Sequence, residues 1–92
     1  MCGIAGVILK TGDADPVILD RLTAALVHRG PDGNGIHIGA GLAHTRLAII
    51  DLETGDQPLT GGGHALVANG EIYNFVELRV DLAEAHFKTK SD

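Results

Sequence analysis

Residues 41–50 read Gly-Leu-Ala-His-Thr-Arg-Leu-Ala-Ile-Ile, an apolar stretch interrupted by a histidine and an arginine. This pattern predicts a β-strand, and the Gly-Ala-Gly turn at 39–41 joins it to a shorter strand at 35–38 as an antiparallel hairpin. Because side chains alternate along a strand, His44 and Arg46 point to one face. The opposite face carries Ala43, Thr45, Leu47 and Ile49. A buried face of this strand must therefore accommodate either an arginine or a threonine.

Two further elements precede the hairpin. Residues 3–9, Gly-Ile-Ala-Gly-Val-Ile-Leu, predict a strand that is buried on both faces. Residues 16–28 predict a helix, because Asp15 is a good N-cap, Pro16 suits the first helical position and apolar residues recur every four positions. The glycine- and proline-rich residues 28–35 then predict an ordered loop between this helix and the hairpin.

Three elements are expected after the hairpin. Residues 51–63 predict a connection rich in glycine, and residues 64–69 predict another strand. Asn74 and Glu77 resemble a capping box for a helix that runs to about residue 86. The order of elements predicts an α+β fold with mostly antiparallel pairing. So few elements leave open sheet edges, and we expect these residues to be the front part of a larger domain.

The composition is that of a small acidic globular domain. The chain has 92 residues, a formal charge of -5 and 45% hydrophobic residues, so at most one folded domain fits. Its scattered basic residues argue against nucleic acid or an anionic membrane as a partner, and its apolar runs are too short for a spanning helix. A single cysteine excludes an intramolecular disulfide. We expect a cytoplasmic protein rather than a membrane or exported one.

Metal and phosphate binding find no support in the spacing of residues. The glycines between 33 and 39 do not match a dinucleotide-binding fingerprint, and no glycine loop is followed by Gly-Lys-Ser/Thr. The candidate metal ligands do not show the close spacing of a metal site; they are Cys2, His28, His44 and His64. We therefore expect neither a metal nor a cofactor within this segment.

Cys2 is a candidate nucleophile. Removal of Met1 would make Cys2 the first residue, and a free α-amine with a pKa near ~7.7 to 8.0 could then act as the base for the adjacent thiol. Taken alone, however, Cys2 is better explained as a small buried hydrophobe at the start of a strand, which is what most lone cysteines are.

Arg46 and the Asn-Gly-Glu stretch at 69–71 each have a structural and a functional interpretation. An arginine in an apolar strand needs an anion, which could be the carboxylate of Asp51 or Glu53, or that of a small substrate. The stretch at 69–71 could direct an amide and a backbone N–H toward a developing oxyanion, although the dipeptide alone favours an ordinary Asn-Gly turn. These alternatives stay open at the level of single motifs.

Four motifs acquire meaning together: Met-Cys-Gly-Ile-Ala-Gly at 1–6, His-Arg-Gly-Pro-Asp-Gly at 28–33, Ala-His-Thr-Arg-Leu at 43–47 and Asn-Gly-Glu-Ile-Tyr-Asn at 69–74. In combination they resemble the glutaminase domain of class II glutamine amidotransferases. The Arg-Gly-Pro-Asp and Gly-Glu-Ile-Tyr-Asn motifs are similar to those of the asparagine synthetase branch of this family. The resemblance covers nearly the whole chain. The segments without a recognisable family motif are 10–20, 60–66 and 84–90.

The resemblance implies the αββα sandwich of N-terminal-nucleophile hydrolases, with residues 1–92 as the N-terminal part of a glutaminase domain. It implies that Cys2 is the attacking residue and that Asn69 and Gly70 form the oxyanion hole. The residues implied to bind glutamine are Arg46 at the α-carboxylate, Leu47 and Ile49 on the substrate-binding strand, and Glu71 and Asp92 at the amino end.

The resemblance also implies an activity, which is hydrolysis of the glutamine amide. The ammonia released would be supplied to an ATP-dependent amide synthetase, and the first expectation is synthesis of asparagine from aspartate. ATP and Mg²⁺ would then belong to a synthetase domain outside these residues. L-glutamine and that C-terminal synthetase domain are the expected partners, and a homodimer is a further option. The alternatives are a related amidotransferase with another acceptor and a non-catalytic glutamine-binding domain. We expect the segment alone to be marginally stable and weak or inactive.

Overall fold

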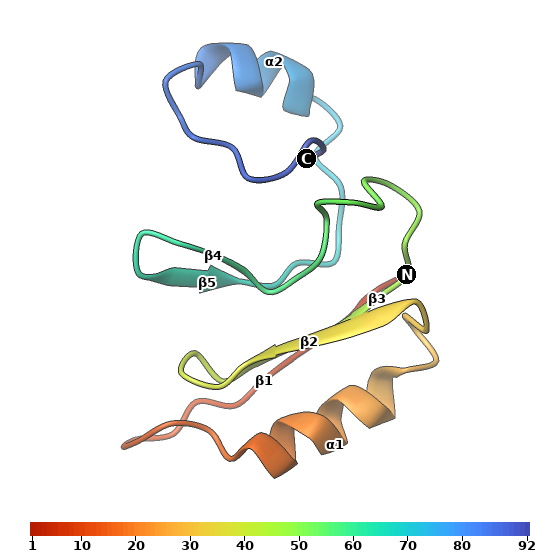
Figure 1. The fold of residues 1–92 in the computed structure, drawn as a ribbon, viewed down its shortest axis with the longest axis vertical. Helices are drawn as coiled ribbons and strands as arrows, with labels where there is room; N and C mark the ends of the chain where they lie inside the picture. The colour runs from red at the N-terminus through yellow and green to blue at the C-terminus, as the bar shows by residue number, and fades with distance from the viewer.

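The computed structural model describes residues 1–92 and has an α+β architecture with antiparallel sheets. Its elements are β1 (Gly3–Gly6), α1 (Pro16–Leu26), β2 (Gly33–His37), β3 (Leu42–Arg46), β4 (Leu59–Gly61), β5 (His64–Leu66) and α2 (Phe75–Asp81). Figure 1 shows them in layers: α1, then the sheet of β1, β3 and β2, then the β4–β5 hairpin, then α2. Neither helix combines the length and the apolar character that crossing a membrane requires.

The first layer and the first sheet form the core. Asp15 caps α1 by accepting the Val17 N–H at 2.9 Å, and Pro16 occupies the start of the helix. Leu19 of α1 is fully buried and clusters with Ala14 and Ala43. The predicted helix therefore forms, although it ends at Leu26 rather than at residue 28.

Thr45 links this helix to the sheet. Its hydroxyl donates to the Leu26 carbonyl at 3.1 Å and accepts the Gly3 N–H at 3.1 Å. A Cβ on Gly3 would lie 2.6 Å from the Thr45 hydroxyl oxygen, so only glycine allows this approach. Thr45 thus faces α1, and by alternation His44 and Arg46 face the other way, as the sequence predicts.

The strands are shorter than predicted because each requires a neighbour. In the antiparallel register Gly3, the first residue of β1, lies opposite Thr45, and Gly33, the first residue of β2, lies opposite Arg46. Because β3 has no paired neighbour beyond this point, it ends at Arg46 instead of continuing to residue 50. The strand expected over 3–9 likewise stops at Gly6, which lies opposite the first residue of β3. Main-chain bonding continues by one step, from the Val7 N–H to the Gly41 carbonyl.

The second half of the chain departs further from the prediction. The expected connection at 51–63 contains β4, which pairs with β5 across a turn whose Gly62 and Gly63 have positive φ. With only this short partner, the strand expected over 64–69 ends at Leu66. Helix α2 ends at Asp81 rather than near residue 86. The Asn74 side chain makes no capping hydrogen bond, so the predicted capping box is wrong.

Candidate active site

Cys2 lies at the start of β1, beside the end of β3. Continued by one residue, the antiparallel register places it opposite Arg46, on the sheet face turned away from α1. The half-buried thiol lies 3.4 Å from the Leu47 nitrogen, whose N–H donates to the sulfur, and 3.9 Å from the Leu47 carbonyl oxygen. The Arg29 side chain donates to the Cys2 carbonyl at 3.2 Å. The cysteine is therefore held by its main chain and faced by a backbone donor.

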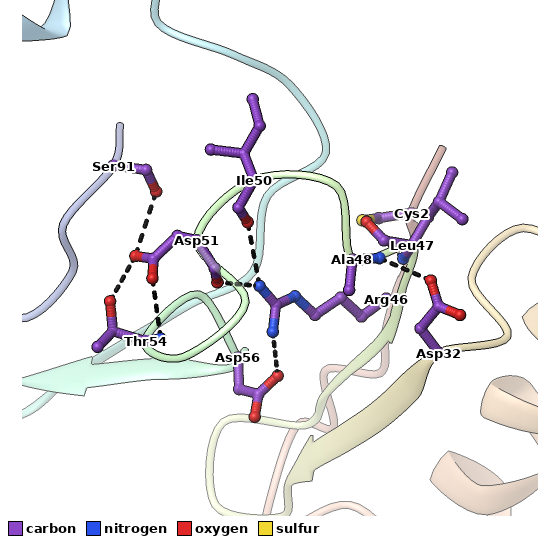
Figure 2. A network of polar contacts seen from close by, with 10 residues as sticks. All are labelled: Cys2, Asp32, Arg46, Leu47, Ala48, Ile50, Asp51, Thr54, Asp56 and Ser91. Atoms are coloured by element: carbon purple, nitrogen blue, oxygen red, sulfur yellow. Dashed lines mark hydrogen bonds and ion pairs between the residues drawn. The ribbon is translucent and has the colours of Figure 1, made fainter.

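Arg46 is 7% exposed, and its guanidinium is surrounded by acceptors from the loop that follows β3 (Figure 2). One terminal nitrogen donates to the Asp56 carboxylate at 2.6 Å. The other donates to the Ile50 carbonyl at 3.1 Å and to the Asp51 carbonyl. The charge and most of the donor capacity of a nearly buried cation are thereby satisfied.

The two carboxylates predicted as structural partners of Arg46 are not its partners. Asp51 contributes only its main-chain carbonyl, and Glu53 instead pairs with Lys90 at 3.0 Å. Asp51 has a φ of 51°, in the left-handed region, and this turn brings Asp56 back to the guanidinium. A partner ten residues along the chain depends on that turn, which sequence spacing does not reveal.

Leu47 and Ile49 lie beyond the end of β3, so their predicted place on a strand is wrong. Leu47 still contributes its backbone to the site through Cys2, whereas Ile49 is 74% exposed. The intervening Ala48 donates its N–H to the Asp32 carboxylate at 2.8 Å (Figure 2). Asp32 also donates its own N–H to the Arg46 carbonyl at 2.9 Å. This residue therefore holds the segment after β3, a role that the sequence did not suggest.

Asn69, Gly70 and Glu71 lie on the exposed segment between β5 and α2, and no hydrogen bond joins them to Cys2. The Asp92 carboxylate accepts the Ile72 N–H, which brings Asp92 next to Glu71 along the main chain. The structure thus brings together two groups separately, Cys2 with Arg46 and Leu47, and Asp92 with the neighbour of Glu71. It does not join the predicted oxyanion residues to the thiol.

Asp51 ties the end of the chain to the loop after β3. Its carboxylate accepts the Thr54 N–H at 2.9 Å, the Thr54 hydroxyl and the Lys90 N–H at 2.9 Å. Hydrogen bonds from the side chain and the backbone of Thr54 are the main reason why the pKa of Asp51 lies well below its usual range. The Ser91 hydroxyl donates to the same carboxylate at 3.4 Å (Figure 2).

An open hollow of about 430 Å³ lies beside this network. It is lined by Ile50, Asp51, Leu52, Glu53, Phe75, Lys90 and Ser91. Neither Cys2 nor Arg46 lines it. We place the candidate site at Cys2, because its thiol receives a backbone N–H and its main chain lies opposite that of Arg46, whose side chain is nearly buried.

His44 is buried on the same sheet face as Arg46, and neither of its ring nitrogens has a hydrogen-bond partner. Burial lowers its pKa, and the neighbouring Arg46 cation acts in the same direction. Burial therefore disfavours the charged form of this imidazole. No three His, Cys, Asp or Glu side chains gather closely enough to hold a metal ion.

Comparison with known proteins places this chain in a family. The family described as the glutamine amidotransferase domain matches residues 1–92. A glutamine-hydrolyzing asparagine synthetase 2 of Oryza sativa subsp. japonica is 46% identical over 101 residues, and glutamine-hydrolyzing asparagine synthetases of Triphysaria versicolor and Brassica oleracea are each 47% identical over 98 residues. These alignments cover 100% of this chain but only 17% of each relative. The chain belongs to the glutamine amidotransferase domain family.

Proposed function

We propose that this chain hydrolyses the side-chain amide of L-glutamine with Cys2 as an N-terminal nucleophile. The observation that carries the proposal is the position of Cys2. Its thiol receives the Leu47 N–H at 3.4 Å, and its main chain lies opposite the nearly buried Arg46 when the pairing of β1 with β3 is continued by one residue. This contact orients the sulfur, and the thiolate of a cysteine is its nucleophilic form. The relatives are described as glutamine-hydrolyzing, which agrees with this chemistry.

The reaction begins when the α-amine of Cys2, freed by removal of Met1, accepts the proton of the thiol. The sulfur attacks the δ-carbonyl carbon of glutamine, and a carbon–sulfur bond forms as the carbonyl oxygen becomes an oxyanion. The Asn69 amide and the Gly70 N–H stabilise this oxyanion. Collapse breaks the carbon–nitrogen bond, and the amine returns its proton to the departing ammonia. Water then hydrolyses the thioester to glutamate and restores the thiol.

Charged groups at both ends of the substrate would position its amide at the sulfur. Arg46 binds the α-carboxylate, while Glu71 and Asp92 bind the α-ammonium group. Leu47 and Ile49 contribute backbone contacts in the segment after β3. The ion-pair partner of Arg46 is Asp56, whose side chain is 83% exposed and therefore open to solvent. A substrate carboxylate approaching from there shares or replaces this exposed partner.

The complete αββα sandwich of N-terminal-nucleophile hydrolases is the fold that this function requires. The succession of helix, sheet, hairpin and helix in Figure 1 supports it, with α1 and α2 as the outer layers. Residues 1–92 then supply the N-terminal portion of each layer. The remaining strands would pair with sheet edges that are open here.

Ammonia released at Cys2 would pass to a synthetase domain in the same protein, where an ATP-activated acceptor carboxylate becomes an amide. Aspartate, giving asparagine, is the acceptor favoured by the names of the relatives. We assign the ATP and Mg²⁺ that this amide synthesis would use to that domain. The proposal includes a cytoplasmic location, and a homodimer is compatible with it.

The test replaces the nucleophile in the intact protein. Cys2→Ala and the isosteric Cys2→Ser should abolish release of ammonia from glutamine, because neither side chain supplies a thiolate. Amide synthesis from added ammonia, measured in parallel, should persist and serves as the control for folding. Glutamine hydrolysis at the parental rate by Cys2→Ala would exclude the proposal. Glutamine binding without hydrolysis by the parent protein would favour a binding domain instead.

A further inference from the structure

The segment that carries Asn69 and Gly70 is held chiefly at Ala68. Residues 67–71 belong to neither β5 nor α2, and they make one hydrogen bond, from the Ala68 N–H to the Gln57 side-chain oxygen at 2.6 Å. Ala68 directly precedes Asn69. The Gln57 amide therefore fixes the peptide from which the two proposed oxyanion donors extend.

Gln57 is itself anchored on the core sheet. Its carbonyl oxygen would lie 2.2 Å from a Cβ on Gly35, so its main chain is seated where only a glycine leaves room. Gly35 lies opposite the buried His44 in the pairing of β2 with β3. On the other side, Gln57 follows Asp56, which is paired with Arg46. The side chain thus extends from a fixed base to a segment that has no other hydrogen bond.

We infer that Gln57 is a positioning residue for the oxyanion hole, an inference that rests on the function proposed above. Oxyanion stabilisation requires donors that are already oriented when charge develops on the substrate oxygen. With the bond to Ala68 removed, the exposed segment samples many conformations, and Asn69 and Gly70 are correctly placed for only part of the time. The loss falls on the transition state rather than on binding of glutamine, whose charged ends are held by other residues.

The hydrogen bond with Ala68 identifies the atom of Gln57 that would position the segment. Its oxygen accepts the Ala68 N–H, while its amide nitrogen makes no hydrogen bond within the chain. Glutamate at this position keeps an acceptor of the same reach, whereas leucine has a similar size and no acceptor. Gln57→Glu and Gln57→Leu are therefore a matched pair that separates the hydrogen bond from the volume of the side chain.

The test measures kcat and KM for glutamine hydrolysis in the intact protein. We expect Gln57→Leu to lower kcat about 10-fold or more and to change KM by less than about 2-fold, with Gln57→Glu within about 3-fold of the parent in both. Gln57→Ser, which is too short to reach Ala68, should repeat the leucine result if leucine impairs folding. In an Asn69→Ala background, Gln57→Leu should have a much smaller effect, because the donor that it positions is gone.

Several outcomes would overturn the inference. If Cys2→Ala is inactive while Gln57→Leu and Gln57→Ser keep the parental kcat, the proposed function stands and the role of Gln57 is wrong. Effects of Gln57→Leu and Asn69→Ala that multiply fully would also contradict it, because residues of one unit do not act independently. Loss of activity through KM alone would contradict it as well. A parent protein that hydrolyses no glutamine would overturn both proposals.

Discussion

Residues 1–46 and residues 47–92 differ in what holds them together. All ten buried residues lie between Gly3 and Arg46, where α1 packs on the three-stranded sheet. The hairpin and α2 of the second half bury no side chain, and Val76 and Val80 of α2 are more than half exposed. Polar contacts hold this half: Arg46 with Asp56, Asp51 with Lys90, and Ala68 with Gln57.

This difference separates two requirements of the proposed chemistry. The nucleophile lies on the half with a hydrophobic core, whereas the residues proposed to stabilise the oxyanion and bind the ammonium group lie on the half held by hydrogen bonds. Hydrogen bonds in exposed segments open at low free energy. We therefore expect substitutions in the hydrophobic core of the first half to act mainly on stability, and substitutions in the exposed segment of the proposed oxyanion donors to act mainly on catalysis.

The largest contrast is expected between two leucines. Leu19 of α1 is 0% exposed and Leu78 of α2 is 38% exposed. Leu19→Ala should lower the free energy of unfolding of the 92-residue chain by about 3 kcal/mol, because it leaves a cavity in the core, and Leu78→Ala by less than about 1 kcal/mol. Urea denaturation measures both. Equal effects would mean that the two halves share one core.

The oxyanion segment is expected to matter only during catalysis. Asn69→Ala in the intact protein should lower kcat about 100-fold while KM for glutamine changes little, because the donor acts on the transition state. Asn34→Ala, at another exposed asparagine, is the matched control and should leave both constants near the parental values. A proportional rise in KM would assign Asn69 to ground-state binding instead.

Arg46 connects the two halves, and a lysine there tests that connection. Arg46→Lys replaces a planar fork by a point charge, so it cannot keep both the Asp56 and the carbonyl contacts. We expect KM for glutamine to rise about 10-fold, with a smaller change in kcat. Steady-state assays should show no change for Arg21→Lys, an exposed arginine of α1. An unaltered KM in Arg46→Lys would make the arginine purely structural.

The smallest effect is expected at Asp51, and it depends on pH. Its pKa is lower in the folded chain than in the unfolded one, so its contribution to stability is complete above about pH 4 and is lost as the pH falls further. In the folded chain the Lys90 amide should keep its chemical shift through pH 4 and change only well below the usual range of an aspartate. Asp51→Asn should remove that transition. Ordinary titration of Asp51 near pH 4, observed by NMR, would contradict the hydrogen-bond network.

The existence and type of most elements could be predicted from the sequence, because they depend on local patterns. Asp15 and Pro16 start α1 in the structure as in the prediction. The face of β3 on which Arg46 lies follows from alternation alone. The ends of the strands could not be predicted, since β3 stops where Gly3 and Gly33 leave it without neighbours.

Contacts between distant residues were the other limit. Asp56 was not predicted to pair with Arg46, because the positive φ at Asp51 that brings it back is a conformation that a non-glycine residue rarely adopts. Gln57 carried no signal either, since one glutamine in a loop gives no hint of its partner. The glycine at 35, placed where Gln57 approaches, was the only trace of that contact in the sequence.

The most direct measurement of the central claim is the intact mass of the protein before and after treatment with a glutamine analogue that carries an electrophilic ketone in place of the amide. We predict that Met1 is absent and that one equivalent of the analogue is attached to Cys2, with labelling prevented by excess glutamine and lost in Cys2→Ser. A protein that retains Met1 and leaves Cys2 unlabelled would contradict it.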